Sequence, residues 1–173
     1  MPMKKTDLIK KLLLLIPLVF LFCSCGYQLV REKGIYGGDI SSIYISIFKN
    51  QTYEPHIAQY VTDAFSKELL TTGLFTVNKE GSDGYMQGTI MKITTQPYTL
   101  SITGITIEKT VTVDVDMALY RKNGNFIKRW PLSESETYRV DIISYEEYNK
   151  QDAIKRLSAR MARRFSAVLF VDY

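Results

Sequence analysis

The sequence predicts an α+β fold: a two-layer sandwich with two helices packed on one face of a roughly four-stranded, mostly antiparallel sheet. Three observations predict this fold. Several segments alternate apolar and polar residues, as half-buried strands do, and two others carry apolar residues at helical spacing. Their order is strand, helix, three strands, helix. Both helical stripes need one shared apolar surface, which the valine-rich face of the sheet can supply. We assign this single domain to residues 41–173.

The first strand and the first helix follow each other directly. Ile43, Ile45 and Ile47 alternate with polar residues, which predicts a strand with one buried face. The period then changes, and an apolar stripe at helical spacing consists of Ile57, Ala58, Val61, Phe65 and Leu69. Pro55 suits the first turn of this helix, and Gly73 suits its end.

The middle of the chain predicts three more strands. A short strand at 75–77 and a turn at 81–84 lead into a strand over 85–95, and 97–104 is predicted to be an exposed loop. The clearest strand, "ITIEKTVTVDVDMALY", turns five apolar residues to one side: Val111, Val113, Val115, Met117 and Leu119. Its opposite face carries Thr110, Thr112, Asp114 and Asp116.

A hairpin and a second helix complete the chain. Asn123-Gly124 favours a tight two-residue turn, and Pro131 predicts an edge or a bulge in the returning strand. Ser144 and Glu147 have the spacing of a capping box at a helix start. The predicted stripe of that helix consists of Ile154, Leu157, Met161, Phe165 and Val168.

The N-terminus has the pattern of a secretory signal. An eleven-residue apolar run, 12–22, follows four lysines and is too short to span a bilayer, which takes about 20 residues. Phe22-Cys23-Ser24-Cys25 resembles the bacterial lipobox, although leucine is usual where Phe22 stands. This resemblance implies a signal peptide over 1–24, cleavage before Cys25, acylation (palmitate included) of Cys25, and a lipid-anchored tether over 25–40. Gly26 in place of aspartate favours the outer membrane over the inner membrane.

Composition argues against several classes of function. The chain has 22 Lys and Arg against 18 Asp and Glu, and four of the lysines and Asp7 fall in the leader. The body is therefore close to neutral, and we expect no nucleic-acid partner. With one histidine, His56, no cysteine left after processing and no phosphate-binding loop, we expect no cofactor, no metal and no enzymatic activity.

Two charged patterns have a functional and a plain interpretation. Asp114 and Asp116 can act as a carboxylate pair, but the simpler interpretation is a solvated or partner-facing sheet surface. The last helix carries five basic residues that can attract anionic lipid, and here too a solvated face is the simpler interpretation: Lys155, Arg156, Arg160, Arg163 and Arg164.

Five segments along the chain form a recognisable combination: "CGYQL", "SIYISIFKNQTYEP", "VTDAFSKEL", "GLFTV" and "SDGYMQGTI". Together they are similar to the LptE-type lipopolysaccharide-assembly lipoproteins of Gram-negative outer membranes. The resemblance implies a periplasm-facing outer-membrane lipoprotein that plugs a large LptD-type β-barrel as its heterodimer partner, aids its assembly and contacts lipopolysaccharide.

Candidate contact residues follow from the surface pattern and not from a matched motif. The polar strand face suits a hydrated barrel lumen, so the barrel-facing candidates are Thr110, Thr112, Asp114 and Asp116. Cations suit the phosphates of lipopolysaccharide, and the contact candidates are Lys109, Arg121, Lys122 and Lys128. The alternative is a periplasmic ligand-binding lipoprotein with a pocket between helices and sheet, lined by Trp130 and tyrosines. A hydrolase that uses His56 is a third hypothesis.

Overall fold

The computed structural model describes residues 35, 39–73, 75–77 and 81–171, without the side chains of 170 and 171. The chain divides into two compact units, Met1–Arg31 and Glu32–Tyr173, and every described residue belongs to the second. The predicted signal peptide (1–24) and the predicted acylation site Cys25 lie outside the described residues. So does the predicted tether (25–40), apart from Ile35, Asp39 and Ile40.

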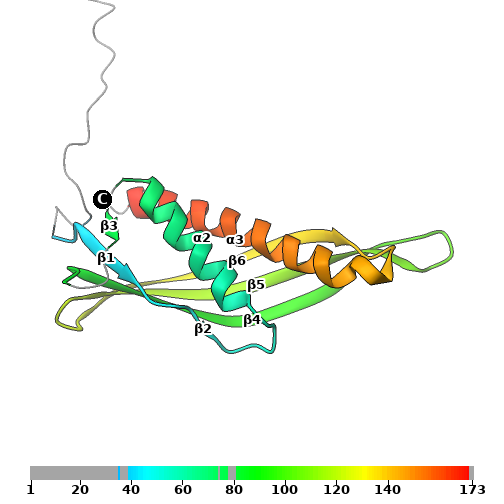
Figure 1. Ribbon diagram of the computed structural model, residues 1–173, viewed down its shortest axis with the longest axis horizontal. Helices are drawn as coiled ribbons and strands as arrows, with labels where there is room; N and C mark the ends of the chain where they lie inside the picture. The colour runs from blue at the N-terminus through cyan, green and yellow to red at the C-terminus, as the bar shows by residue number, and fades with distance from the viewer. Residues whose placement is uncertain (1–34, 36–38, 74, 78–80, 172–173) are drawn as a thin grey trace, which may run out of the picture. The chain divides into compact units, whose positions relative to one another are not determined.

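The described unit has two layers, with two helices lying over one face of a six-stranded sheet (Figure 1). The elements in chain order are β1 (Ser42–Ile45), β2 (Lys49–Asn50), α2 (Ile57–Thr71), β3 (Thr76–Val77), β4 (Gly84–Leu100), β5 (Thr106–Arg121), β6 (Phe126–Arg139), the 3₁₀ turn η1 (Ile143–Tyr145) and α3 (Glu146–Val171). The α+β prediction is confirmed. The strand number was underestimated: β3 lies within the short strand predicted at 75–77, but β2 was not predicted separately, because its two residues are too few to show a period.

The sheet order is β3-β1-β4-β5-β6, with β2 also paired to β4. The long strands β4, β5 and β6 are antiparallel neighbours, whereas the short strands pair in parallel. β6 is an edge strand, which explains how Pro131 is accommodated without an N–H group. The long hairpin of β4 and β5 extends beyond the end of the helical layer (Figure 1).

The prediction of a loop at 97–104 was correct for residues 101–104 and wrong for 97–100. β4 continues to Leu100, Pro97 lies opposite Lys109, and the turn is confined to residues 101–105. Register shifts around Thr99 keep the ladder going after Pro97. Proline and threonine favour a loop when only neighbours in sequence are considered, but here the pairing with β5 decides the conformation.

One apolar cluster fills the space between the layers. The five predicted inward residues of β5 are all buried, as are Ile57, Val61, Phe65 and Leu69 of α2. Aromatic rings link the layers, with centroids 5.2 Å apart for Phe48–Phe65, 5.5 Å for Phe65–Phe165 and 5.4 Å for Trp130–Phe165. Gly88 is essential to this packing, because a Cβ there would lie 2.2 Å from the Phe48 ring.

Two apolar positions were assigned to the wrong face. Ile47 is 77% exposed, because β1 ends at Ile45 and Phe48 enters the core in its place. Val168 is 43% exposed and Leu169 is buried, so the last step of the α3 stripe is four residues and not three.

Both helix starts lie later than predicted. α2 begins at Ile57 after His56, which has a positive φ of 59°, so Pro55 precedes the helix. α3 begins at Glu146, so Ser144 lies in η1 and not at the N-cap position. The stop at Gly73 is confirmed by its φ of 66°. The connection at Asn123-Gly124 is a turn, but it spans residues 122–125 and not two residues.

Candidate interface on the outer face of the sheet

The sheet face turned away from the helices carries the four predicted barrel-facing residues. Thr110, Thr112, Asp114 and Asp116 are half-buried and alternate with the buried valines of β5. Their position follows from the period of two, because every second side chain must point away from the core. The structure therefore brings these four side chains into one row along the middle of the three long strands.

Each residue of this row has a polar partner on β6. Thr110 Oγ1 lies 3.1 Å from Thr137 Oγ1, and Thr112 Oγ1 lies 2.8 Å from Ser135 Oγ. Ser133 Oγ donates to Asp114 Oδ1 at 2.6 Å, and Arg129 Nε lies 3.4 Å from Asp116 Oδ2. These cross-strand hydroxyl pairs make the face polar, and the part around Thr110 and Thr112 is nearly uncharged.

Sequence analysis missed the β6 half of this row. Ser133, Ser135 and Thr137 alternate with Glu134 and Glu136, a period-two signal that could have placed them opposite Asp114, Thr112 and Thr110. We refer to these three residues with the four of β5 as the hydroxyl face.

The part of the hydroxyl face around Asp114 and Asp116 is hollowed. A hollow of about 420 Å³ opens beside Met91, Asp114, Asp116, Arg129 and Leu132. Asp116 Oδ1 is buried there and has no hydrogen-bond partner among the described residues. A buried carboxylate oxygen normally accepts a hydrogen bond, so this atom can accept one from a molecule that covers the face.

The four cationic candidates do not form one site. Lys109 Nζ contacts Glu146 Oε1 at 2.6 Å near one end of β5. Arg121 contacts Asp39 at 3.2 Å at the other end, where Lys122 lies in the adjoining turn and Lys128 Nζ lies 5.5 Å from the centre of the Trp130 ring. Lys109 and Arg121 are twelve residue steps apart along the extended strand, about 40 Å.

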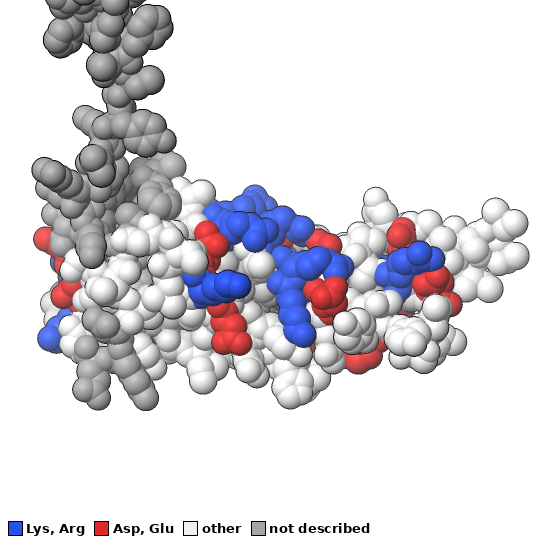
Figure 2. Space-filling model, turned by 45° about the horizontal axis from the view of Figure 1, so that its top comes forward, with Lys and Arg blue, Asp and Glu red and all other residues white. Residues whose placement is uncertain are grey.

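Of the five basic residues of α3 named above, three are paired with acidic residues on β6: Arg156, Arg160 and Arg164. Glu134 receives contacts from Arg160 at 2.9 Å and from Arg164 at 2.7 Å, and Glu136 receives them from Arg156 at 3.0 Å and from Arg160 at 2.7 Å. Figure 2 shows the resulting interleaving of basic and acidic side chains over the helical layer. This interleaving favours the plain interpretation of the α3 cations over a patch for anionic lipid.

These ion pairs perturb both carboxylates. Burial alone would raise the pKa of Glu134, but hydrogen bonds and charge attraction from Arg160 and Arg164 outweigh it and hold the pKa below its usual value. The pKa of Glu136 is lowered in the same way, by Arg160 and Arg156 against the effect of burial.

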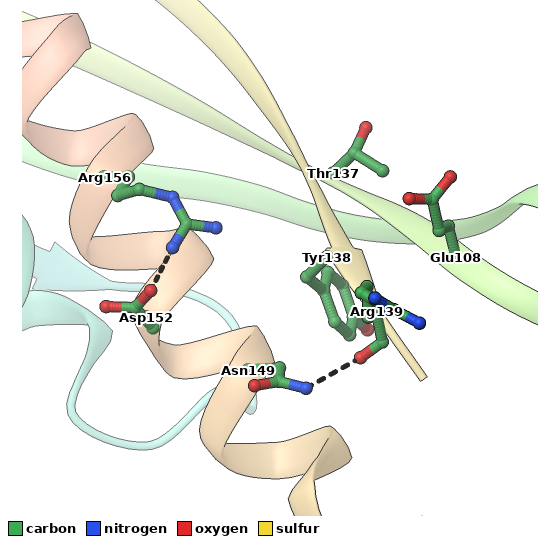
Figure 3. Close-up of a pocket in the computed structure, with 7 residues that line it drawn as sticks. All are labelled: Glu108, Thr137, Tyr138, Arg139, Asn149, Asp152 and Arg156. Atoms are coloured by element: carbon green, nitrogen blue, oxygen red, sulfur yellow. Dashed lines mark hydrogen bonds and ion pairs between the residues drawn. The ribbon is translucent and has the colours of Figure 1, made fainter. Parts of the chain in front are cut away.

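A second hollow, of about 280 Å³, lies where the end of β6 meets the first turns of α3 (Figure 3). Asn149, Asp152 and Arg156 line it from the helix, whereas Thr137 and Arg139 line it from β6 and Glu108 from β5. Arg156 is paired with Asp152, and Asn149 Nδ2 donates to the Arg139 carbonyl at 3.0 Å. These groups are bonded to each other and do not converge on one point, so this hollow is a poor catalytic site.

The "NQTYEP" segment has a structural role. Asn50 Oδ1 accepts from the N–H of Thr52 at 2.9 Å, and Asn50 Nδ2 donates to the Glu54 carbonyl at 2.9 Å. The buried Glu54 side chain forms an ion pair with Lys150 of α3. The segment thus closes on itself and ties the start of α2 to α3.

The described residues offer little for catalysis or metal binding. His56 is exposed at the start of α2, with its ring 6.5 Å from the Tyr60 ring. Within 35, 39–73, 75–77 and 81–171, no three His, Cys, Asp or Glu side chains are grouped as metal ligands are. In the same ranges no helix combines the length and apolar character that crossing a membrane requires.

Comparison with known proteins identifies a family. The model of the family described as "LptE: Lipopolysaccharide-assembly" matches residues 40–167. No functionally curated protein matches the chain.

Solved structures share the fold at low sequence identity. A protein described as a lipoprotein from Caulobacter crescentus has a TM-score of 0.51 and 16% identity, over 70% of this chain and 86% of that one. CT253 from Chlamydia trachomatis has a TM-score of 0.55 and 10% identity, over 78% and 94%. Rare lipoprotein B from Shewanella oneidensis has a TM-score of 0.50 and 12% identity, over 74% and 94%. At these identities the structural likeness supports the fold alone.

Proposed function

The chain belongs to the LptE lipopolysaccharide-assembly family, and from this membership we propose that it is a lipid-anchored plug and assembly factor of the outer-membrane lipopolysaccharide translocon. At the level of the family it is an assembly lipoprotein of Gram-negative outer membranes and not a catalyst. The signal peptide at 1–24, the acylated Cys25, the tether at 25–40 and the single domain at 41–173 are parts of this proposal.

The hydroxyl face is the observation that carries the plug role. Its hydroxyl groups are paired across strands, so it stays stable when wet, yet each oxygen keeps a lone pair for an outside donor. The inner wall of a large outer-membrane barrel is polar, and a face of short, mostly uncharged side chains can lie against it with little desolvation of charge. We propose that Thr110, Thr112, Asp114 and Asp116 face an LptD-type barrel.

Photocrosslinking from one position on the sheet and one on the helical layer tests this orientation. A photoreactive amino acid at Thr112 is expected to capture a large outer-membrane barrel protein in living cells. The matched control is Arg163, an exposed residue on the helical layer. Capture of the barrel from Arg163 and not from Thr112 would contradict the proposed face.

Lipopolysaccharide contact is proposed at the cationic candidates, in two separate places. Arg121, Lys122 and Lys128 lie towards the β5–β6 turn and can meet phosphate groups together, whereas Lys109 can make only a distant second contact. Lys122→Ala with Lys128→Ala is therefore expected to weaken lipopolysaccharide binding by the purified protein more than Lys109→Ala does. Equal effects would exclude a shared phosphate site at this turn.

The transport role has its own test. Depletion of the protein is expected to lower the amount of lipopolysaccharide that reaches the cell surface. An unchanged surface amount, with the protein absent, would contradict the function at the family level and not merely the choice of contact residues.

The alternative of a ligand pocket between helices and sheet has weaker support. The hollow where α3 crosses β6, beside Leu132, Met161 and Val168, has about 230 Å³. Ligand pockets usually measure about 300–1,000 Å³. Phe48, Phe65, Phe165 and Trp130 occupy the centre of the interlayer space.

A further inference from the structure

The two edges of the long three-stranded part of the sheet differ in what covers their backbone. β6 forms one edge, and α3 covers part of it, since Arg160 donates to the Ser135 carbonyl. β4 forms the other edge from Ile90 to the apex of the β4–β5 hairpin, the turn at 101–105. Figure 1 shows the β1–β2 segment following β4 over only part of its length. Its backbone bonds to β4 end with the one from Gln51 N–H to the Ile90 carbonyl, at 3.1 Å.

The strand pairing determines which backbone groups of β4 point away from the sheet. Ser135 turns its carbonyl outwards to α3, so Thr112, the residue opposite, turns its own N–H and C=O towards β4. Thr94 lies opposite Thr112 and forms these bonds. Ile93 and Thr95 therefore point their N–H and C=O groups outwards. Within the part of the chain that the structure describes, these four groups have no hydrogen-bond partner.

The uncovered run of β4 is short, and we call residues 92–96 the open edge. The shift in β4–β5 register at Met91 bounds it on one side, and Pro97, which has no N–H, bounds it on the other. Five residues extend about 17 Å, the length of one ordinary strand. A bulge and a proline prevent long edge-to-edge pairing. The open edge therefore suits one short strand better than the whole hairpin of a second copy of this chain.

The side chains of the open edge define the strand that fits it. Ile93 packs against the apolar cluster on the helical side. Thr94 and Gln96 lie on the other side, in register with two residues of the hydroxyl face. Lys92 is exposed and forms no ion pair with any described residue. Cross-strand neighbours of matching type stabilise a sheet, so the fitting strand alternates apolar and polar residues and places an acidic residue beside Lys92.

We propose that the open edge pairs with a short extended segment of the barrel partner, which adds one strand to the sheet beside β4. Only an extended backbone repeats a donor and an acceptor every second residue, about 7 Å apart, as Ile93 and Thr95 do. The wall of a closed barrel has no free strand edge. The pairing segment is therefore a loop or a terminal segment of the partner that enters the barrel lumen.

The inference rests on the proposed plug function, because that function brings the partner to this edge. Thr110 and Thr112 lie opposite Gln96 and Thr94, the polar residues of the open edge. A protein that covers these two threonines lies within about 10 Å, two strand spacings, of a strand added beside β4. The hydroxyl face and the open edge would then form one continuous interface.

Amide hydrogen exchange tests the pairing directly. Exchange is measured at single-residue resolution on the full-length protein alone and on its purified complex with the barrel, in the same detergent. The N–H groups of Ile93 and Thr95 should exchange at least about tenfold more slowly in the complex, because exchange requires their new hydrogen bonds to open. Thr94 and Gln96 are internal controls, since their N–H groups bond to β5 and should exchange slowly in both samples.

Two variants at one position separate backbone pairing from side-chain contact. Thr95→Pro removes the outward N–H, as Pro97 does two residues later, and keeps the pairing of its neighbours with β5. Thr95→Val keeps this N–H. Both variants lose the hydroxyl group that bonds to Tyr138. We expect about tenfold less barrel to co-purify with Thr95→Pro than with Thr95→Val, with the same circular dichroism for both isolated proteins.

Each contrary result has a distinct meaning. Unchanged exchange at Ile93 and Thr95 in a complex in which Thr112 still crosslinks to the barrel overturns the strand pairing and leaves the plug function standing. Equal co-purification of the two variants does the same. Protection that appears in the isolated protein and rises with its concentration identifies a second copy as the occupant, and the proposal is then wrong. Failure of Thr112 to capture a barrel contradicts the plug function, and the strand pairing falls with it.

Discussion

The two halves of the β4–β5 hairpin differ in what holds them. The half under the helices has Met86, Gly88 and Ile90 against the apolar cluster, and its stability comes from burial. The other half, residues 93–107, has cross-strand bonds but no fully buried side chain, and Ile102 is fully in solvent. One continuous ladder of β4–β5 pairing therefore joins two halves. Packing against the core constrains the residue types in one half, and it does not constrain them to the same degree in the other.

The two turns of β5 make the same contrast on a smaller scale. In each, the residue before the turn accepts from a glycine N–H three positions later, at 2.9 Å for Gly104 and 2.8 Å for Gly124. Both glycines have positive φ, 79° and 84°. One turn nevertheless exposes Ile102 and Ile105, and the other exposes Lys122 and Asn123. Backbone geometry thus leaves the side-chain chemistry open.

The largest effect is expected in the covered half. Phe65→Ala removes a fully buried ring that packs on Phe48 and Phe165, and it should lower the free energy of unfolding by about 3–5 kcal/mol. Urea unfolding followed by circular dichroism measures this change. A loss below about 1 kcal/mol would mean that the interlayer cluster is not the source of stability.

Gly88→Ala should have the next largest effect. The added methyl group would meet the Phe48 ring at 2.2–2.5 Å, and Phe48 is 2% exposed and has little room to move. Overpacking of this kind costs about 1–3 kcal/mol. Gln96→Ala, at an exposed position in the uncovered half of the same strand, is the control and should leave the melting temperature nearly unchanged.

The two turn glycines should respond equally. Gly104→Ala and Gly124→Ala each place a Cβ in open space but at positive φ, so each should cost about 1–2 kcal/mol. Thermal unfolding of the two variants compares them directly. A loss of stability in only one of the two variants would show that the two turns are not equivalent.

Acid should remove a smaller contribution from the β6–α3 ion pairs. The pKa values of Glu134 and Glu136 are lowered on folding, so the pairs contribute stability above the ordinary pKa of about 4.5 and lose it as pH falls through the lower folded values. Because the arginines are partly exposed, we expect about 1 kcal/mol or less per pair.

Unfolding measured between pH 5 and pH 3 checks this sign. The double variant Glu134→Gln and Glu136→Gln should lose less stability over this range than the parent. The pKa of Asp83 is also lowered, by hydrogen bonds from Ser42 and Ser41. Its contribution to the pH dependence of stability is the same in the parent and in the double variant, so it cancels from the comparison. A double variant that loses as much stability as the parent would contradict the ion-pair account.

The smallest effect on stability is expected at the apex. Ile102→Ser should change the free energy of unfolding by no more than about 0.5 kcal/mol, because the side chain contacts solvent. Chemical denaturation of the protein in detergent solution measures it. A loss above about 1 kcal/mol would show that the apex packs on the body and is not a free surface.

The candidate interface shows how far periodicity reaches. The alternation along β5 predicted which of its residues face outwards, and the structure places Thr110, Thr112, Asp114 and Asp116 together. The alternation along β5 could not identify their partners on β6, because partner identity depends on the register between the two strands. These partners are Ser133, Ser135 and Thr137. The orphan oxygen of Asp116 is likewise invisible in sequence, because its burial comes from neighbouring strands.

By itself the sequence determined the α+β class, the main strands, both helices, the stop at Gly73 and the resemblance to its family. These features depend on local period and on residues whose backbone preferences are strong. Only the tertiary structure decided that 97–104 forms strand and turn, that the arginines of α3 pair with Glu134 and Glu136, and that Lys109 lies far from Arg121. Each of these outcomes depends on contacts between residues far apart in the chain, whose energies are not encoded in any single segment.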